Sequence, residues 1–206
     1  LETVTWAAGL AAHSKRIQVF ATVHTAFNHP IVTAKQLATL DQLSNGRLGL
    51  NVVAGWNKPE YEAFGVDLPS NHSDRYAMAQ EWFDYVQKLW REDKPFDWQG
   101  DFYQGKGVYS LPHPAQNNVP VLNAAASEEG RAFAMRNADF LFTPVFDFDQ
   151  ASETVEEIAL RGKAVGRDVK VLTFSTVVCR PTQAEADDYL DYYANQHADW
   201  EAVDNL

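Results

Sequence analysis

Patterns typical of strands and of helices alternate along this chain, and this alternation limits the fold more than any other feature. Short apolar runs that predict strands begin near residues 17, 48, 119, 140 and 169, and an amphipathic stretch follows each of them. Such alternation is typical of a parallel sheet with helices outside it. Five strand–helix units fit either an open doubly wound sheet or part of a closed barrel, so periodicity alone does not separate the two.

The predicted elements have definite ends along most of the chain. Helices are expected at residues 5–12, 30–43, 74–91, 127–136, 152–165 and 182–197, and strands at 16–23, 48–53, 119–122, 140–142 and 169–178. Pro30 can begin its helix because the first helical turn needs no N–H at that position. His29 caps the same helix, and Thr182 with Glu185 forms a capping-box pattern.

Helical spacing predicts one buried aromatic and aliphatic face, made of Trp82, Tyr85, Val86, Leu89 and Trp90. Trp6 and Leu10 are expected to pack the first helix.

Two stretches interrupt the regular pattern. A long polar loop is predicted over residues 56–74, and its length favours a functional role. Residues 96–114 are rich in aromatics, Gly and Pro, and begin with a predicted small β-hairpin. Within this stretch, Gly100 to Gly107 nearly fits a phosphate-binding P-loop, but the Ser or Thr after Lys106 is absent and Pro112 follows where a helix should start.

Composition and charge exclude several classes of partner. The net charge of −11 disfavours nucleic acid and anionic membranes. No apolar run approaches the roughly 20 residues of a membrane span, and no secretory leader is recognisable. The single cysteine, Cys179, excludes an internal disulfide and a cysteine-only metal site. We therefore expect a cytoplasmic protein. The chain lacks an initiator methionine and begins inside a predicted helix, so we expect a piece of a longer protein.

Polar residues follow the predicted strands at their carboxyl ends, where sites lie in such folds. These residues are His24 and Thr25, Asn51 with Trp56, Asn123 to Ser127, and Thr143. Asn51 is the most unusual, because an amide inside an apolar strand covered on both faces needs hydrogen-bond partners from protein, water or ligand. The strand ends therefore predict one polar site on one edge of the sheet.

Three motifs carry a resemblance to a known family. The segments 41–47 (DQLSNGR) and 51–56 (NVVAGW) and the pair Arg75-Tyr76 resemble the bacterial luciferase-like flavin-dependent monooxygenases, most closely those acting on dimethylsulfone, pyrimidines and alkanesulfonates. The resemblance implies an α/β fold, a (β/α)8 TIM barrel with a polar loop and a hairpin insertion. Residues 1–206 would form one partial domain that lacks the first two barrel strands and the last one.

The resemblance also implies residues that contact FMN. It places Ser127 at the FMN phosphate, whereas the residue pattern alone favours an ordinary helix cap, with Glu128 and Glu129 repelling an anion. It places Arg75 and Tyr76 against FMN too, although their pattern alone fits a surface Arg and a half-buried Tyr. Asn51 and Glu60 match positions near the flavin ring and ribityl chain. For Glu60, the sequence supports a solvent-exposed loop carboxylate nearly as well as a flavin contact.

His24 is the candidate catalytic residue, because imidazole titrates near neutrality and can orient a substrate group. The alternative is a hydrogen-bonded structural histidine at a strand end. A metal site is not expected, since His24 and His29 lack a third ligand in the sequence.

The implied function is that of a two-component monooxygenase. A separate flavin reductase would supply reduced FMN, and dioxygen would then oxidise a small organic substrate, a sulfone or sulfonate first and a nitrogen heterocycle second. Trp56 and Phe64 would help to exclude water. Full-length protein is expected to form a homo-oligomer. Two alternatives remain open: a deazaflavin-dependent enzyme of hydride transfer, and a flavin-binding protein without turnover.

Overall fold

The computed structural model describes residues 1–145 and 147–204. The chain divides into two compact units, residues 1–173 and the segment from Phe174 onward, and each is described by itself.

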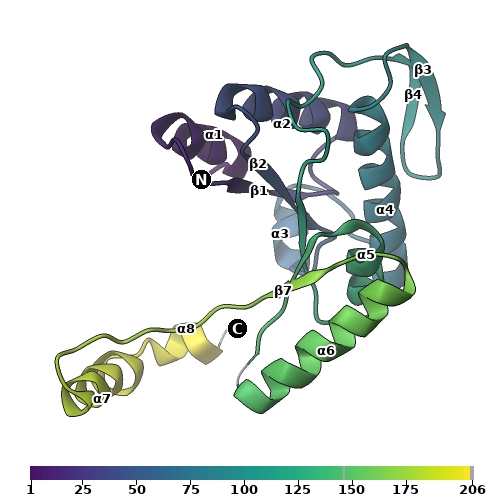
Figure 1. Cartoon of the computed structure of the whole chain (residues 1–206). Helices are drawn as coiled ribbons and strands as arrows, with labels where there is room; N and C mark the ends of the chain where they lie inside the picture. The colour runs from purple at the N-terminus through teal and green to yellow at the C-terminus, as the bar shows by residue number, and fades with distance from the viewer. Residues whose placement is uncertain (146, 205–206) are drawn as a thin grey trace. The chain divides into compact units, whose positions relative to one another are not determined.

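The first unit is built on an open parallel sheet (Figure 1). Its strands lie in the order β1 (Val19–His24), β2 (Leu48–Val53), β5 (Val121–Ala124), β6 (Phe140–Phe142) and β7 (Lys170–Leu172). Every neighbouring pair is parallel. Neighbours in space thus follow chain order from one edge to the other, whereas a doubly wound sheet reverses its order at a switch point. The order is that of an arc of a (β/α)8 barrel, a distinction that periodicity could not make.

Helices cover one face of this sheet in the same sequence. They are α1 (Thr3–His13), α2 (Pro30–Ser44), α4 (His72–Leu89), α5 (Glu128–Asn137) and α6 (Phe148–Ala164). The predicted hairpin is confirmed as β3 (Phe96–Gln99) and β4 (Gln104–Val108), which pair antiparallel. The predicted long loop is wrong in one respect. Residues 58–63 form a short helix, α3 (Lys58–Ala63), and α4 begins at His72.

Local sequence explains the helix ends. The His29 side chain accepts a hydrogen bond from the Ile31 N–H, so it caps α2 as predicted. Asn45 ends α2 in the left-handed conformation with φ 56°, which Asn and Gly tolerate best. The capping box of Thr182 with Glu185 is also present.

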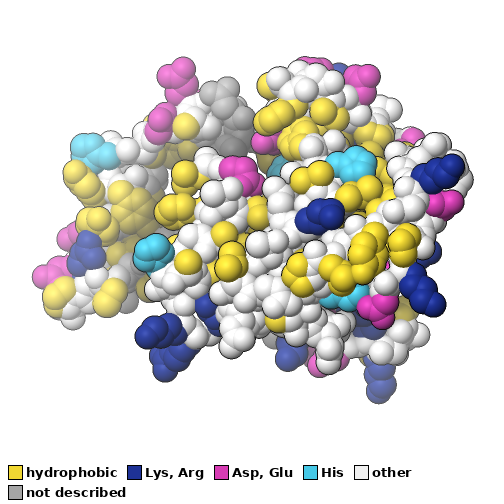
Figure 2. Space-filling model, turned by 90° about the horizontal axis from the view of Figure 1, so that it is seen from above, with side chains coloured by type: hydrophobic (Ala, Val, Ile, Leu, Met, Phe, Trp, Pro, Cys, Tyr) yellow, Lys and Arg dark blue, Asp and Glu magenta, His cyan; other side chains and the backbone are white. Residues whose placement is uncertain are grey.

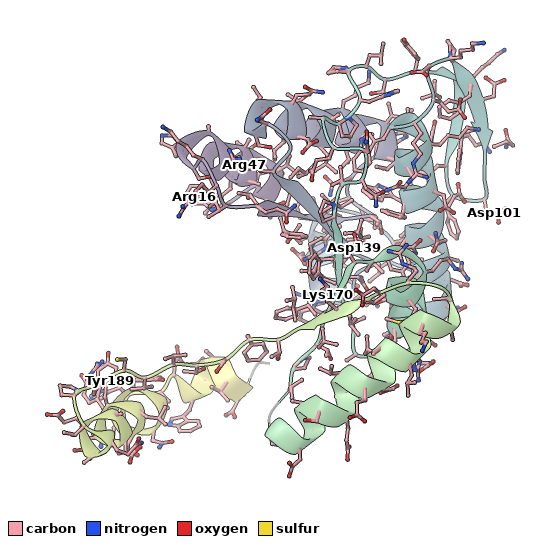
Figure 3. The ribbon with its side chains drawn as sticks, in the orientation of Figure 1. Arg16, Arg47, Asp101, Asp139, Lys170 and Tyr189 are labelled. Atoms are coloured by element: carbon pink, nitrogen blue, oxygen red, sulfur yellow. The ribbon has the colours of Figure 1, made fainter. Side chains whose placement is uncertain are left out.

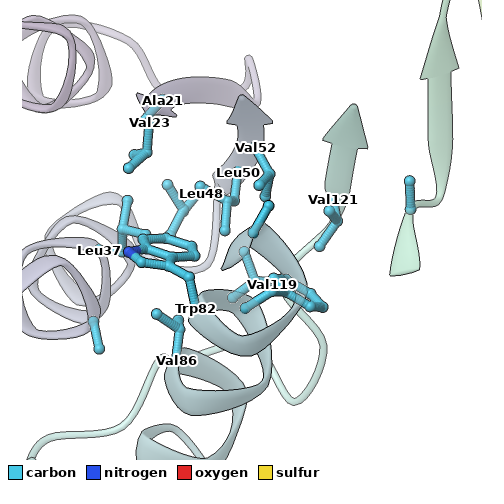
Figure 4. Close-up of a cluster of buried hydrophobic side chains, with 14 of the residues drawn as sticks. Ala21, Val23, Leu37, Leu48, Leu50, Val52, Trp82, Val86, Val119 and Val121 are labelled. Atoms are coloured by element: carbon cyan, nitrogen blue, oxygen red, sulfur yellow. The ribbon is translucent and has the colours of Figure 1, made fainter. Parts of the chain in front are cut away.

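The core lies between the sheet and the helices (Figure 4). Trp82 of α4 has no exposed surface and lies beside Leu37 of α2 and Leu48 of β2, and its indole N–H donates to the Asn28 carbonyl at 2.6 Å. The predicted buried face of α4 is confirmed, with all five of its residues buried. Truncating such a tryptophan to alanine typically costs about 3–5 kcal/mol. The aromatic stripe of α4 is therefore structural.

Two residues of the first resemblance motif hold elements together. Arg47 donates to the carbonyls of Ala11, Ser14 and Ile17, and so joins the end of α1 to the start of β1 (Figure 3). Asp41 is fully buried and accepts hydrogen bonds from the Leu48 N–H and from Gln116. This motif is accounted for by folding, and it lies away from the carboxyl ends of the strands.

The other face of the sheet is only partly covered. Side chains alternate along a strand, and the helix-facing residues Val19, Ala21 and Val23 of β1 are buried while those between them are half-exposed. The pairing register places Thr22, Asn51, Leu122, Phe140 and Lys170 in one row of this second face, which we call the inner face. The expectation that both faces of β2 are covered is therefore wrong for the described residues, because only the helix-facing side is fully packed.

A glycine shapes the inner face. A Cβ at Gly49 would lie 2.5 Å from the ring of Phe20, so only glycine lets that ring cross β2. Phe20 thereby reaches Phe140 of β6, with ring centroids 6.0 Å apart and the planes at 87°. The part of the inner face near the amino ends of the strands is therefore apolar, and its polar groups lie nearer the carboxyl ends of the strands.

Some predicted apolar contacts are wrong. Trp6 and Leu10 are 54% and 40% exposed, because α1 buries Val4, Ala7 and Ala11 on its other side. Ile17 precedes β1 and is also exposed. Seen from above, hydrophobic side chains lie among charged ones over the surface (Figure 2).

The predicted last strand ends early. β7 stops at Leu172, whose carbonyl accepts from the Thr143 N–H, and Pro144 then removes the next donor from the neighbouring segment. The second unit holds α7 (Gln183–Asp191), a π-helical turn η1 (Tyr192–Gln196) and α8 (Trp200–Asp204), in place of one helix over 182–197. None of these elements buries a residue among those described.

Candidate functional site

The polar strand ends, the α3 segment and the first turn of α4 supply the candidate site. His24 ends β1, the segment after β2 leads into α3, Arg75 and Tyr76 lie early in α4, and Ser127 precedes α5. All belong to the first unit. The structure connects these residues in two groups, one around His24 and one around Ser127, and the charge of Arg75 acts on a tyrosine of each.

The first group pairs His24 with Tyr61. The Tyr61 hydroxyl lies 3.0 Å from His24 Nδ1, and the Tyr61 side chain has no exposed surface. Burial, reinforced by the charge of Glu60, raises the pKa of Tyr61 to about 12. Burial lowers the pKa of His24, and the charge of Glu60 only partly opposes it. At neutral pH the pair is therefore a neutral phenol beside a neutral imidazole.

Arg75 is a buried cation with an unused donor. Its residue is 8% exposed, and one terminal nitrogen, Nη1, donates to the carbonyls of Pro69 at 2.9 Å and Ser70 at 3.3 Å. Nε is buried and lacks a hydrogen-bond partner within the described part of the chain. A buried charged donor without a partner is costly, so this position suits an anion. The sequence reading of a surface Arg is wrong.

The second group surrounds the start of α5. Ser127 caps α5 by accepting from the Gly130 N–H at 3.2 Å, so the ordinary capping role is real. Burial raises the pKa of Tyr76, while a hydrogen bond with the Ser127 side chain and the charge of Arg75 oppose the rise. A Cβ at Gly130 would lie 2.5 Å from the Tyr76 hydroxyl oxygen, so glycine is needed for this approach. Hydroxyls and helix N–H groups thus gather at one helix start.

The acidic residues at the start of α5 repel an anion less strongly than the sequence indicates. Glu128 pairs with Arg161 at 2.6 Å, and Glu129 is exposed to solvent. The pair with Arg161 offsets the charge of Glu128. The dipole of the helix start and the charge of Arg75 both favour a phosphate group there.

Asn51 lies in the middle of the inner face with one atom unsatisfied. Its Nδ2 donates to Thr22 Oγ1 at 3.1 Å, and its Oδ1 is buried without a partner among the described residues. Thr25 Oγ1 and Asn123 Oδ1 are orphaned in the same sense. Asn123, however, is on the helix-facing side of β5, where its Nδ2 donates to the Val52 carbonyl. Asn51 is thus the amide that can accept from a molecule on the inner face.

The remaining predicted residues are more open. Glu60 is exposed on α3, so a direct contact with a cofactor stays a prediction. Trp56 and Phe64 are 73% and 67% exposed, although Phe64 lies 4.6 Å from Phe27 between ring centroids. Both aromatic residues are free to cover a bound molecule. In the described part of the chain, no three His, Cys, Asp or Glu side chains gather as metal ligands, and no helix is long and apolar enough to cross a membrane.

Sequence reasoning missed Tyr61 as a member of the site. A signal existed, because Pro59 opens a helical turn and places Tyr61 and Phe64 three residues apart on one side of it. What the sequence could not show is that the hydroxyl of this buried tyrosine meets His24, which is 37 positions away.

The residues present fit FMN. Arg75 with its free Nε–H, the Tyr76 and Ser127 hydroxyls and the start of α5 suit the phosphate. The orphaned Asn51 Oδ1 suits the polar edge of a flavin ring, and the apolar inner face suits its plane.

Comparisons with known proteins agree with this fold. The model of the luciferase-like monooxygenase family matches residues 1–205. The pyrimidine monooxygenase RutA of Escherichia coli is 35% identical over 213 residues, covering 98% of this chain and 56% of that protein. The FMNH(2)-dependent dimethylsulfone monooxygenase of Pseudomonas putida is 32% identical over 186 residues, covering 90% of this chain and 51% of that protein.

The fold has close relatives among solved structures. A crystal structure of riboflavin lyase RcaE, with modified FMN and riboflavin, is similar with a TM-score of 0.84 at 27% identity, covering 93% of this chain and 48% of that one. The predicted α/β fold of the luciferase-like barrel type is thereby confirmed. The chain spans about half the length of the proteins it matches.

Proposed function

The chain belongs to the luciferase-like monooxygenase family, and we propose that the full-length protein is a two-component, flavin-dependent monooxygenase. A separate flavin reductase supplies reduced FMN, and dioxygen serves to oxidise a small organic substrate. The observation that carries the proposal is Arg75, a buried guanidinium with an unpartnered Nε–H whose charge acts on the Tyr76 hydroxyl. A buried charged donor of this kind suits an anionic ligand, and the FMN phosphate would provide one.

Four groups are proposed to bind the FMN phosphate. Arg75 would donate through Nε, Tyr76 and Ser127 would offer hydroxyls, and the first N–H groups of α5, which begins next to Ser127, would add to them. Because Arg75 also binds the Pro69 and Ser70 carbonyls, it fixes the segment before α4 at the same time. Binding of FMN would therefore also order the residues that lead from α3 into the site.

The inner face of the sheet is proposed to bind the flavin ring. Asn51 would accept a hydrogen bond from the flavin through its unpartnered Oδ1, while its Nδ2 donates to Thr22 Oγ1. Val53 and Leu122 lie on positions of that face next to Asn51 and would help to exclude water from a ring bound there. When bound, reduced FMN supplies the two electrons that allow one oxygen atom to reach the substrate and the other to leave as water.

His24 and the α3 segment face the reacting region. The neutral imidazole of His24 can orient a polar group of the substrate without adding charge to a dry site. Glu60 is proposed to reach the ribityl chain from the exposed side of α3. Trp56 and Phe64 are proposed to close over the bound molecules, and their exposure beside this segment supports the proposal.

We propose a sulfone or sulfonate as the first substrate class and a nitrogen heterocycle as the second. The 32% identity to a dimethylsulfone monooxygenase supports the first class, and the 35% identity to pyrimidine monooxygenases supports the second. The test combines full-length protein, FMN, a flavin reductase with its electron donor, and isotopically labelled dioxygen. Mass spectrometry should find label in one product when dimethylsulfone, an alkanesulfonate or a pyrimidine is added.

Label that accumulates only in hydrogen peroxide and water with every substrate class would refute the proposal. The control omits the reductase, which should abolish labelling if the two-component arrangement is right. Parallel incubation with a reduced deazaflavin in place of FMN tests the hydride-transfer alternative. Substrate reduction without oxygen uptake would favour that alternative.

The proposal extends to assembly and location. Val32 and Leu43 of α2 and Trp6 of α1 are exposed apolar residues, which supports a homo-oligomer of the full-length protein. A cytoplasmic location is supported by Cys179, which is free and exposed.

A further inference from the structure

Tyr61 and His24 share one hydrogen bond, and its direction depends on which group carries the proton. The Tyr61 hydroxyl lies 3.0 Å from His24 Nδ1. In the described part of the chain, each of these two side chains is the only hydrogen-bond partner of the other. Tyr61 has no exposed surface, so water does not reach its hydroxyl. Gly55, at φ +107°, leaves the space that this hydroxyl fills, because any Cβ there would collide with it.

Two proton arrangements are possible for this pair. If Nδ1–H donates to Tyr61, the buried tyrosine O–H is left without an acceptor, which costs about 1–3 kcal/mol. If the Tyr61 O–H donates to Nδ1, one bond satisfies both the buried hydroxyl and the imidazole nitrogen. The second arrangement leaves the ring proton of a neutral His24 on Nε2.

We propose that Tyr61 is a positioning residue that donates its hydroxyl proton to His24 Nδ1 and fixes His24 as the Nε2–H tautomer. His24 then offers a hydrogen-bond donor, and not a base, to a molecule on the inner face. The tautomer stands on the geometry alone, whereas its catalytic meaning rests on the proposed monooxygenase function.

The packing around the pair holds this geometry. The Phe27 ring stacks on His24 at 5.3 Å and 16°, and lies 4.2 Å from the Tyr61 ring, so it fixes both planes. Burial keeps Tyr61 protonated, since its pKa is raised to about 12, and burial keeps His24 neutral by lowering its pKa.

Charged and titratable groups come to the pair from three elements. Glu60 of α3 acts on both His24 and Tyr61, and Arg75 of α4 acts on Tyr61. Tyr103, between β3 and β4, donates its hydroxyl to the Thr25 carbonyl, next to His24. Glu60 and Arg75 have opposite charges, so neither proton position is imposed by one net charge.

The tautomer restricts the chemistry of the substrate. An Nε2–H donor requires an acceptor on the molecule, such as a sulfonyl oxygen or a ring carbonyl. Asn51 offers the complementary acceptor, Oδ1, on the same face of the sheet. The inner face thus favours molecules whose polar atom near His24 is an oxygen without a proton.

Nitrogen-15 NMR of the full-length protein without FMN tests the tautomer directly, because the two ring nitrogens of a neutral histidine differ in shift according to which carries the proton. The parent protein at slightly alkaline pH should show His24 protonated at Nε2. Tyr61→Phe keeps the ring that packs on Phe27 and removes only the donor. It should yield a mixture of tautomers and raise the pKa of His24 by roughly 0.5–1, the equivalent of one neutral hydrogen bond.

Tyr103→Phe is the matched control. It also removes a tyrosine hydroxyl near the end of β1, from a half-buried residue whose pKa is raised to about 12 in the parent, but that hydroxyl contacts Thr25 and not His24. It should leave the tautomer and the pKa of His24 unchanged. Parent protein protonated at Nδ1 overturns the proposal without any variant, and so does a Tyr61→Phe protein whose His24 is unchanged.

Failure of the proposed function is distinguishable from failure of this inference. The NMR measurement needs neither flavin nor turnover. In the active enzyme, Tyr61→Phe should lower kcat several-fold more than it changes the Kd of reduced FMN, whereas a protein that oxidises no substrate but shows the Nε2–H tautomer refutes only the monooxygenase proposal.

Discussion

Glu81 of α4 anchors the β3–β4 hairpin, and its replacement tests how that hairpin supports the site. One carboxylate accepts hydrogen bonds from the N–H groups of Asp101 at 2.9 Å, Phe102 at 3.0 Å and Tyr103 at 2.8 Å, and from the Trp98 indole at 3.2 Å. Gly100 lies so close that any side chain there would collide with the carboxylate. Since the Tyr103 hydroxyl binds the Thr25 carbonyl, the anchor extends to the end of β1.

Glu81→Gln removes the charge and one of the two acceptor oxygens. Hydrogen bonds to a charged group contribute roughly 1.5–3 kcal/mol each, and the amide still accepts about half of them. Losing two of four bonds at the lower end of that range predicts a loss of about 3 kcal/mol. Urea denaturation of the full-length protein at pH 7 measures it, and amide hydrogen exchange at residues 101–103 should accelerate.

The pH dependence gives an independent check. Burial alone raises the pKa of Glu81, but the four hydrogen bonds outweigh it and leave the pKa below its ordinary value. The stabilisation is therefore present above the unfolded pKa and is lost as pH falls through the folded pKa, so parent and variant should converge in acid.

Glu62→Gln is the control. Among the described residues Glu62 pairs only with Lys58, at 3.4 Å on an exposed surface, so the substitution should cost at most about 0.5 kcal/mol. A Glu81→Gln protein as stable as that control at pH 7, with unchanged exchange at residues 101–103, would refute the reasoning.

Three further substitutions separate the two ends of the flavin site. Arg75→Ala should weaken FMN by about 1.5–3 kcal/mol in equilibrium titration while riboflavin, which lacks the phosphate, binds almost as in the parent; equal FMN affinity removes Arg75 from the site. Gly130→Ala places a Cβ 2.5 Å from the Tyr76 hydroxyl oxygen, so it should also weaken FMN more than riboflavin, and unchanged FMN affinity would contradict this. Asn51→Ala should weaken FMN and riboflavin equally, by about 1 kcal/mol or roughly fivefold, and a loss confined to FMN would contradict its place at the ring.

The regular part of the fold could be predicted from the sequence because its signals are local. Apolar runs such as residues 48–53 and the aromatic stripe on α4 carry their own periodicity, and Thr182 with Glu185 marks a helix start within four residues. The order of the strands was beyond reach, because neighbouring strands β2 and β5 are separated by a long insertion and pair only in three dimensions. The prediction that Trp6 is buried was wrong because the sequence of α1 has apolar residues on two sides, and only the packing decides which side is buried.

The candidate site was predicted in part for the same reason. A general rule of parallel sheets pointed to His24, Asn51 and Ser127. The structure places His24 at the end of β1 and Ser127 after β5, whereas Asn51 lies within β2. The burial of Arg75 and its free Nε–H depend on carbonyls of the preceding segment, which no periodicity reveals. The partnership of Tyr61 with His24 likewise arises only when α3 packs against the end of β1.

The reoxidation of reduced FMN by dioxygen tests the central claim most directly. Full-length protein in excess is mixed anaerobically with reduced FMN and then with oxygenated buffer in a stopped-flow spectrophotometer. If the site of Arg75, Tyr76, Ser127 and Asn51 holds the reduced flavin away from water, oxidised FMN should return much more slowly than in free solution, and Arg75→Ala should restore most of the free rate. Reoxidation at the free-solution rate with parent protein in excess would contradict the claim that this chain forms a flavin site for oxygen chemistry.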